Sequence, residues 1–262
     1  DNIDISYVCG NKKIFKKLNK IGDMLLAYKL NKILKEKKID IVISHMEVTA
    51  KVLRYLSINK VYYMRVDITK ELKDLKNTSI SRYNRRKKLY HSIFDNQNII
   101  TISQEANSNL CEFINPKKIE TIYNPFDFEN IKKLSMIQLD EKLDFNYILQ
   151  IGSGFKVKGQ NTLLRAFAKI KDKKIKLVLV GTSEYEEISK LIEQLELQDR
   201  VVFITYTKNP YPYIKKAKIL VISSNREGLP RVLVESLILN VPVVSTDCDT
   251  GPREILINEF SN

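Results

Sequence analysis

Two glutamates separated by seven residues bracket the start of an apolar helix in the second half of the chain. The segment reads Arg226-Glu227-Gly228-Leu229-Pro230-Arg231-Val232-Leu233-Val234-Glu235. Proline suits the first helical turn, which predicts Glu227 in the loop and Glu235 within the helix, about 7–8 Å further along the axis at ~1.5 Å per residue. A buried carboxylate is costly unless it is paired. The free amides of a helix N-terminus attract anions, so the pattern favours a site with phosphates between a sugar and a ribose.

Both glutamates also have a purely structural interpretation. Glu235 lies one turn after Arg231 and could pair with it, although that order of charges is the weaker one in a helix. Glu227 could be a solvated acid of an exposed loop. These interpretations stay open beside the functional one.

A glycine-rich turn earlier in the chain has the residue types for binding phosphate. It reads Gly152-Ser153-Gly154-Phe155-Lys156-Val157-Lys158-Gly159 and precedes an expected helix. Its spacing matches neither the dinucleotide-binding fingerprint nor the P-loop. Lys156 and Lys158 are placed to neutralise a phosphate near the helix start, whereas the alternative is a turn with no ligand.

Short β-rich runs alternate with amphipathic stretches along the chain, which is typical of α/β proteins with parallel sheets. In the first half, strands are expected at 39–44, 61–65, 99–103 and 119–123, and helices at 12–38, 47–57, 79–94 and 104–114. In the second half, strands are expected at 147–151, 176–180, 201–203, 219–223 and 241–245, and helices at 159–171, 184–196, 210–217 and 230–239. Residues 126–145 are polar and read as a connector. We therefore predict two α/β domains, 1–142 and 143–262.

The chain is strongly basic. Its 262 residues include 44 Lys and Arg against 31 Asp and Glu, a formal charge of +13. Residues 1–145 carry 27 basic and 18 acidic side chains (+9), and residues 146–262 carry 17 and 13 (+4). This excess suggests an anionic partner, although a lysine-rich composition accounts for part of it.

Several classes of site are excluded by composition. Three distant cysteines and two histidines make a disulfide framework, a zinc site or a histidine-rich metal site improbable. The triplet Asp247-Cys248-Asp249 has the spelling of a metal motif, and we interpret it as a coincidence. No apolar run has the length of a membrane span and no signal peptide is recognisable, so a cytoplasmic protein is expected.

At these residues the sequence resembles the large GT-B family of retaining glycosyltransferases, group 4. The resemblance rests on the Glu-x7-Glu pattern within SSNREGLPRVLVESL, the following VPVVSTDCDTGPREIL (241–256), Lys158-Gly159-Gln160, Asn209-Pro210-Tyr211, KILVISS (218–224) and IYNPFD (122–127). It implies two Rossmann-like, doubly wound domains that face a cleft. Family segments expected before Asp1 and after Asn262 are absent from the sequence, so both domains are expected to be incomplete.

The resemblance implies a role for each matching residue. Lys158 would hold the donor diphosphate, Glu227 would contact the transferred sugar and Glu235 the ribose hydroxyls. His45, in the triplet SHM, would face the sugar. The other donor-binding residues would be Lys156, Ser153, Gly228, Leu229, Pro230 and Arg231. Ser153 stands where the family usually has an arginine, which removes one phosphate contact, and Lys156 lacks the guanidinium fork that would replace it.

The implied reaction moves a hexose or N-acetylhexosamine from a nucleotide sugar, with UDP expected as the nucleotide, and retains the anomeric configuration. Negative charge grows on the leaving diphosphate, and Lys158 with the helix N-terminus would stabilise it. These fixed positive groups take the place of a metal, so neither a metal nor another cofactor is expected.

The first domain carries the basic stretch 82–88, and helix 12–38 contributes ten basic residues. Three or four of them facing an anionic leaflet, at ~1 kcal/mol each, would favour peripheral attachment to the inner face of the cell membrane. This suits a glycan acceptor or a polyprenyl-diphosphate-linked saccharide in surface-polysaccharide assembly. The alternative is a solvated basic face.

Two other functions compete with glycosyl transfer. A catalytically silent, glycosyltransferase-like partner subunit is suggested by Ser153 alone. A basic nucleic-acid-binding protein would show binding that weakens steeply with salt, but no nucleic-acid module is recognisable and the Glu-x7-Glu helix would have no role, so we expect no nucleic acid as partner.

Overall fold

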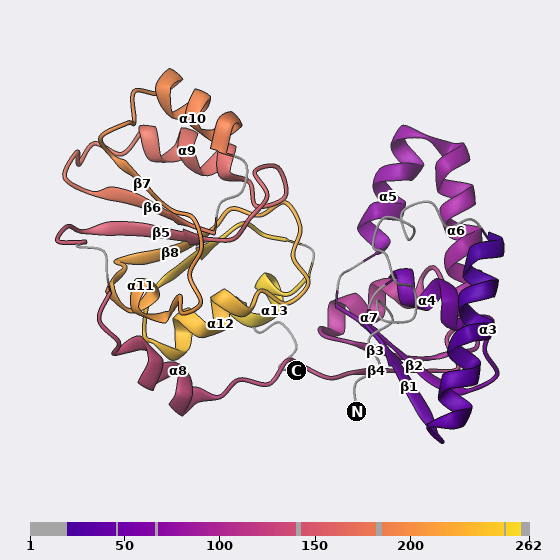
Figure 1. The fold of residues 1–262 in the computed structure, drawn as a ribbon. Helices are drawn as coiled ribbons and strands as arrows, with labels where there is room; N and C mark the ends of the chain where they lie inside the picture. Colours follow the sequence, from indigo (N-terminus) through magenta and orange to yellow (C-terminus); the bar gives the residue numbers. More distant parts are fainter. Residues whose placement is uncertain are drawn as a thin grey trace. The chain divides into compact units, whose positions relative to one another are not determined.

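The computed structural model describes residues 20–45, 47–65, 68–139, 143–181, 185–248 and 250–257 of the chain (Figure 1). It is an α/β protein that divides into two compact units, Asp1–Tyr123 (unit 1) and Asn124–Asn262 (unit 2). The division lies before residues 124–142, which the sequence pattern assigned to the first domain. The reason is helix α8 (Phe128–Ser135), which packs on two helices of unit 2.

Unit 1 is built on a four-stranded parallel sheet in the order β1-β2-β3-β4. The strands are β1 (Ile41–Ser44), β2 (Asn59–Met64), β3 (Asn98–Thr101) and β4 (Lys118–Thr121). The helices are α3 (Lys20–Glu36), α4 (Glu47–Leu53), α5 (Thr69–Thr78), α6 (Ile80–Phe94) and α7 (Gln104–Cys111). Apolar side chains from all five helices join one core around Tyr62, Tyr90 and Phe94, each about 1% exposed.

Unit 2 holds a five-stranded parallel sheet in the order β7-β6-β5-β8-β9. The strands are β5 (Tyr147–Ile151), β6 (Lys176–Val180), β7 (Val201–Ile204), β8 (Ile219–Ile222) and β9 (Val243–Ser245). The helices are α8, α9 (Gln160–Ala168), α10 (Tyr185–Gln194), α11 (Tyr211–Lys216), α12 (Arg231–Ile238) and α13 (Pro252–Leu256).

The sheet of unit 2 is covered on both faces, which explains its nearly continuous apolar strands. Leu177 and Leu179 of β6 join the core formed with α9 and α10, while Val178 and Val180 join the core formed with α8, α11 and α12. Figure 1 shows these two groups of helices on opposite sides of the sheet. The alternation follows from the two-residue period of a strand.

Strand order reverses at β5, which pairs with β6 on one side and β8 on the other. In open parallel sheets ligands bind beyond the carboxyl ends of the strands at such a switch point. The glycine-rich turn follows β5, and the loop with Glu227 follows β8. The topology therefore brings the two predicted phosphate-binding segments to one edge of one sheet.

The predicted strands are confirmed with shifts of a few residues, and three helices were not predicted. The part of the expected helix 12–38 before residue 20 lies outside the described residues. The segment interpreted as a connector contains α8, which Asp127 caps by accepting a hydrogen bond from the Asn130 amide at 3.0 Å. Helices α5 and α13 were missed because each has few buried side chains, among them Leu72 and Pro252. No helix in the described part of the chain is long and apolar enough to cross a membrane.

Candidate functional site

Lys158 and Glu227 meet at the switch point of unit 2. The Lys158 Nζ lies 2.7 Å from Glu227 Oε1, and the Ser224 hydroxyl donates to the same oxygen at 2.6 Å. The two side chains are 25% and 11% exposed. Glu227 is therefore not the solvated loop acid of the structural interpretation, since it is shielded and holds two donors.

The backbone of Lys158 is anchored to both central strands. Its amide donates to the Gly154 carbonyl at 2.8 Å. Its own carbonyl accepts hydrogen bonds from Gln150 Nε2 on β5 at 2.9 Å and from the Ser223 hydroxyl after β8 at 2.8 Å. Gln150 is only 3% exposed. Sequence reasoning missed it, although a glutamine within the buried apolar run YILQI was a usable signal.

Two glycines allow the turn after β5 to approach its neighbours. Gly152 has φ +142°, and a Cβ there would lie 2.9 Å from Cε of Lys158. Gly159 has φ +60°, and a Cβ there would lie 1.9 Å from the Ser223 carbonyl oxygen. A side chain at either position would displace Lys158 or separate the two loops.

The segment after β9 packs against the loop that carries Glu227 and forms a hydrogen bond with it. The Thr250 hydroxyl donates to the backbone carbonyl of Glu227 at 2.5 Å. Gly251, with φ +71°, packs so closely that a Cβ would lie 2.2 Å from the Gly228 carbonyl oxygen. Thr250 was not among the predicted site residues, and only the fold brings it to this loop.

Glu235 is buried on α12, with 7% of its surface exposed. Its Oε1 lies 3.6 Å from Nε of Arg231, and it forms a hydrogen bond with Tyr211. Burial raises the pKa of Glu235, and Arg231 and Tyr211 oppose that rise. Burial and the nearby Glu235 also raise the pKa of Tyr211. The pairing with Arg231 that the sequence allowed is thus present. A buried carboxylate with a raised pKa is also typical of functional sites.

The N-terminus of α12 lies between the two glutamates. Pro230 stands just before the first helical residue, and no side chain caps this end of the helix. Leu229 and Pro230 are buried, and Gly228 is half-buried. The amides at this end therefore have no side-chain acceptor and are available to an anion.

The remaining predicted residues are exposed. Ser153 and Lys156 lie on the surface of the glycine-rich turn, where the Asn225 side chain binds the Lys156 carbonyl at 2.6 Å. His45 follows β1 in unit 1 and meets the ring of Tyr63 edge-on, at 5.0 Å between centroids. It thus belongs to the other unit from Lys158 and Glu227.

Asp247 of the DCD triplet does not contribute to a metal site in the described part of the chain. Its carboxylate binds Arg253, with 2.5 Å between Oδ2 and the guanidinium, and this pairing lowers the pKa of Asp247. Within the same residues no three His, Cys, Asp or Glu side chains gather in a way that would hold a metal ion. Asp249 lies outside the described residues.

Several proteins with similar sequences are named as glycosyltransferases. An uncharacterized glycosyltransferase of Methanocaldococcus jannaschii, MJ1059, is 32% identical over 255 residues, which cover 90% of this chain and 62% of that protein. A second relative is the N-acetylgalactosamine-N,N'-diacetylbacillosaminyl-diphospho-undecaprenol 4-alpha-N-acetylgalactosaminyltransferase of Campylobacter jejuni, 39% identical over 145 residues, or 54% of this chain and 38% of that protein. The chain thus spans less than two thirds of the length of these relatives.

Solved structures share the fold. Anabaena Alr3699/HepE in complex with UDP-glucose superposes with a TM-score of 0.69 at 20% identity, over 88% of this chain and 65% of that one. Sucrose-phosphate synthase of Thermosynechococcus elongatus gives a TM-score of 0.73 at 19% identity, over 94% and 63% of the two chains. The fold is therefore GT-B, with two Rossmann-like units, as predicted. Residues 132–262 match the family of glycosyl transferases group 1. This match covers half of the chain, and the chain therefore belongs to the family of glycosyl transferases group 1.

Proposed function

We propose that this protein transfers a hexose or N-acetylhexosamine from a nucleotide sugar, with UDP as the nucleotide, to a glycan or a lipid-linked saccharide with retention of configuration. The observation that carries the proposal is the shielded Lys158–Glu227 pair next to the uncapped N-terminus of α12. The name of the Campylobacter relative, which includes a diphospho-undecaprenol saccharide, and the UDP-glucose complex of HepE support the substrate classes.

The proposed chemistry follows from where charge develops. The bond between the anomeric carbon and the diphosphate oxygen breaks, its electron pair stays on the diphosphate, and an acceptor hydroxyl bonds to the carbon while its proton passes to the departing diphosphate. Lys158 and the amides at Gly228 and Leu229 are placed to stabilise the growing negative charge. The bound diphosphate would replace Glu227 as the ion-pair partner of Lys158. The Glu227 carboxylate would then accept hydrogen bonds from the hydroxyls of the sugar. With fixed cations in this role, we propose that no metal or other cofactor is needed.

The cluster on α12 is proposed to bind the nucleoside. Glu235 would accept hydrogen bonds from the ribose hydroxyls while Arg231 and Tyr211 hold its carboxylate in place. The Arg231 guanidinium is itself stacked 4.8 Å from the ring centroid of Phe126. A ribose there would add hydrogen bonds to those that this buried carboxylate forms with Tyr211 and Arg231.

The exposed residues are proposed to complete the site. Lys156 and Ser153, on the surface of the turn after β5, would contact the phosphates, and Pro230 would hold the loop in front of α12. His45, at the carboxyl end of β1, would face the transferred sugar from unit 1.

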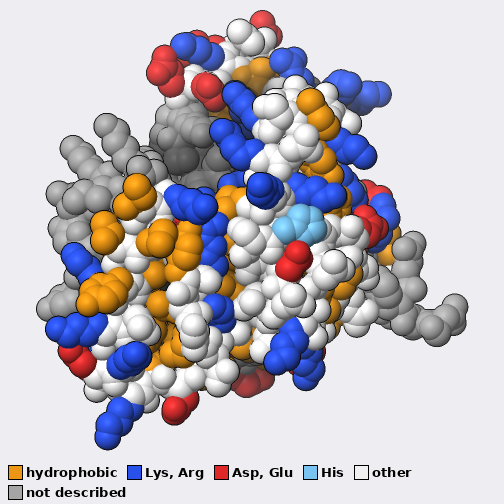
Figure 2. Space-filling view, turned by 90° about the vertical axis from the view of Figure 1, so that its right-hand side faces the viewer, with side chains coloured by type: hydrophobic (Ala, Val, Ile, Leu, Met, Phe, Trp, Pro, Cys, Tyr) orange, Lys and Arg blue, Asp and Glu red, His pale blue; other side chains and the backbone are white. Residues whose placement is uncertain are grey.

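We also propose a cytoplasmic protein that associates with the inner face of the membrane through α3. Four apolar side chains of this helix are between 53% and 75% exposed and follow the spacing of one helical face: Ile21, Met24, Leu25 and Tyr28. Figure 2 shows a face of the molecule on which lysine and arginine side chains gather beside exposed hydrophobic ones. An exposed apolar stripe beside basic residues such as Lys20 and Lys29 is typical of helices that lie in the interface of an anionic bilayer.

Flotation with vesicles tests the membrane proposal. The double variant Met24→Gln and Leu25→Gln should lose most of its binding to phosphatidylglycerol vesicles. The matched control replaces Met136 and Ile137, two exposed apolar side chains of unit 2, by glutamine. Equal binding by both variants would rule out α3 as the membrane contact.

A screen of donor hydrolysis and transfer against a panel of nucleotide sugars tests the catalytic proposal. Glu227→Gln should lower turnover by roughly 100-fold or more, the scale of losing one preorganised electrostatic contact. Glu187→Gln, an exposed acid on α10, is the control and should keep full activity. Turnover should not change on addition of EDTA. Full activity of Glu227→Gln would refute the assignment, and UDP binding without turnover of any donor would indicate a silent subunit.

A further inference from the structure

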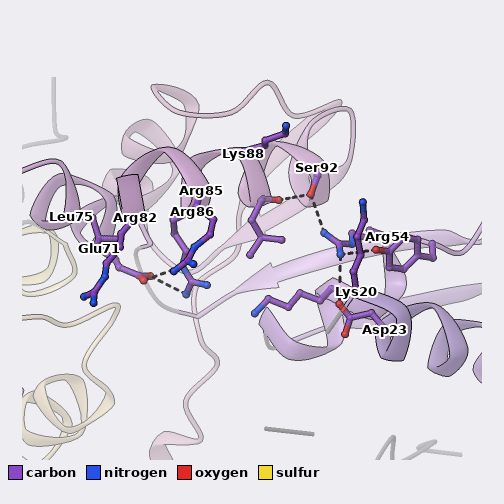
Figure 3. Close-up of a pocket in the computed structure, with 13 residues that line it drawn as sticks. Lys20, Asp23, Arg54, Glu71, Leu75, Arg82, Arg85, Arg86, Lys88 and Ser92 are labelled. Carbon is purple, nitrogen blue, oxygen red and sulfur yellow. Dashed lines mark hydrogen bonds and ion pairs between the residues drawn. The ribbon is translucent and has the colours of Figure 1, made fainter. Parts of the chain in front are cut away.

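Unit 1 contains a pocket of about 960 Å³ between α3, α4, α5 and α6 that the proposed donor site does not use (Figure 3). Seven basic side chains but only two acidic ones line it. Its volume is that of a site for a small organic ligand. Ligand sites usually have few charged residues, whereas nine of the thirteen residues that line this pocket are charged, so the function of these charges needs an explanation.

Part of this charge is used to build the walls. The Arg86 guanidinium binds Glu47 of α4 at 2.6 and 2.8 Å and Glu71 of α5 at 3.0 Å. Tyr90 donates to Glu71 at 2.8 Å, and Lys51 binds Glu47 at 2.6 Å. Arg86 is thus a bidentate clamp between three helices, and its geometry is fixed without a ligand.

A second set of contacts closes the opposite end of the pocket. Arg54 of α4 lies 3.5 Å from the Asp23 carboxylate on α3 and donates to the Ser92 hydroxyl on α6 at 3.1 Å. Burial raises the pKa of Asp23, while Arg54 and Lys51 oppose that rise. Three cations, Arg54, Lys51 and Arg86, therefore balance the three carboxylates of Asp23, Glu47 and Glu71.

Further cations are left over. Lys20, Arg82, Arg85 and Lys88 also line the pocket, and none of them forms an ion pair with the residues that the structure describes. Figure 3 shows Lys20 extending from α3 toward the arginines of α6, whereas Lys88 points away from them. Arg82 and Arg85 lie three residues apart and thus on one face of α6. Three unbalanced positive charges therefore surround this concave surface.

A multivalent anion bound in the pocket would offset the repulsion among these three positive charges. Lys20, Arg82 and Arg85 are exposed, and two helices bring all three to the lining of one pocket. Two of the three are arginines, whose planar fork suits phosphate oxygens. A diphosphate carries several negative charges on a compact group, and the pocket leaves room for a sugar joined to it.

We propose that this pocket of unit 1 binds the diphosphate group of the saccharide acceptor, with Lys20, Arg82 and Arg85 as its donors. The identification of the ligand as an acceptor rests on the glycosyltransferase function proposed above, whereas the anion site itself does not. The recognised chemistry is the diphosphate, which either a lipid-linked or a soluble acceptor can carry.

Calorimetric titration with inorganic pyrophosphate tests the site. The titration is done with the donor site saturated with UDP, and repeated in Lys158→Gln, so that the donor site does not contribute. Arg82→Gln with Arg85→Gln should weaken binding at least about tenfold, because two charge-assisted hydrogen bonds are lost. Both side chains are exposed and form no ion pair within the described part of the chain, so the variant should keep its circular dichroism and melting temperature.

A matched control removes the same charge elsewhere on unit 1. Lys73→Gln with Lys76→Gln changes two exposed lysines of α5 that do not line the pocket, and pyrophosphate affinity should change less than about twofold, as expected of distant surface charges screened by salt. An equal loss in this control would overturn the proposal, because binding would then reflect net charge alone.

The source of the ligand and the proposed function are separated by two further measurements. Wild-type protein that binds phosphatidylglycerol vesicles but not pyrophosphate would overturn the proposal in favour of a membrane contact. Donor hydrolysis by the Arg82/Arg85 double variant should stay at the wild-type rate. Loss of pyrophosphate binding with intact hydrolysis supports the pocket, whereas absence of hydrolysis in every protein refutes the glycosyltransferase function and leaves the anion site standing.

Discussion

Replacing Lys158 by methionine is expected to affect stability and catalysis separately. The substitution removes a 2.7 Å charged hydrogen bond and leaves the Glu227 carboxylate, 11% exposed, with Ser224 as its remaining side-chain donor. A hydrogen bond to a charged group contributes about 1.5–3 kcal/mol, and the partial exposure of Lys158 places this one near the lower end. At ~2–4 °C per kcal/mol for a protein of this size, the melting temperature should fall by roughly 3–6 °C.

The double variant Lys158→Met with Glu227→Gln separates the expected loss of stability from the expected loss of turnover. It replaces the orphaned carboxylate by a neutral amide, so most of the lost stability should return. Donor turnover should stay at least about 100-fold below wild type, because the diphosphate has lost its cation. Thermal unfolding followed by circular dichroism and a donor-hydrolysis assay on the four proteins give the coupling energy. A double variant as unstable as Lys158→Met, or one that regains turnover, would refute the reasoning.

Two further substitutions test the geometry of the site. Gly159→Ala should destabilise the protein by more than about 1 kcal/mol, because φ is +60° and the new Cβ would overlap a carbonyl oxygen. Gly154→Ala should destabilise the protein less, because φ is +101° there but the nearest atom is 3.9 Å away from the new Cβ. Equal melting temperatures of the two variants would contradict this reasoning. Glu235→Gln should raise the melting temperature at pH 7 and weaken UDP binding. Because folding raises the pKa of Glu235, stability is lost as pH rises through the folded pKa. The advantage of the variant should therefore shrink as pH falls toward the ordinary value of 4.5; an advantage that grows in acid would show the sign to be wrong.

The fold of unit 2 was largely predictable from local pattern. Its strands are short apolar runs bounded by turn residues, and the bounds of β5 and β6 agree with the prediction. Such runs are required because both faces of the sheet are covered. Helix α5 was less predictable, because half of its sequence TKELKDLKNT is charged and Leu72 is its one buried apolar residue. The boundary between the units could not be predicted either, because α8 has the polar composition of a linker and only its packing assigns it to unit 2.

The site was predictable as a set of residues but not as an arrangement. The spacing of Glu227 and Glu235 around a proline identified both acids and the helix start. That Lys158 contacts Glu227 across 69 positions of sequence depends on β5 and β8 being neighbours. Gln150 holds one loop from within an apolar strand that matches no motif, and the resemblance of the segment 241–256 does not indicate that the Thr250 hydroxyl reaches the Glu227 carbonyl.

By resemblance the sequence indicated the glycosyltransferase family, and by itself it determined the α/β class, the candidate acids and lysines of the proposed donor site and the basic excess of the first half of the chain. These depend on composition and on spacing within one segment, which local physics translates directly into strands, helices and loops. Only the tertiary structure decided which charges are satisfied. Arg86 and Arg54 find carboxylates on other helices, whereas Lys20 and Arg85 find none among the residues that the structure describes, although all four side chains are cations. Long-range packing makes this distinction, because an ion pair needs two side chains to be held within a few ångströms of each other.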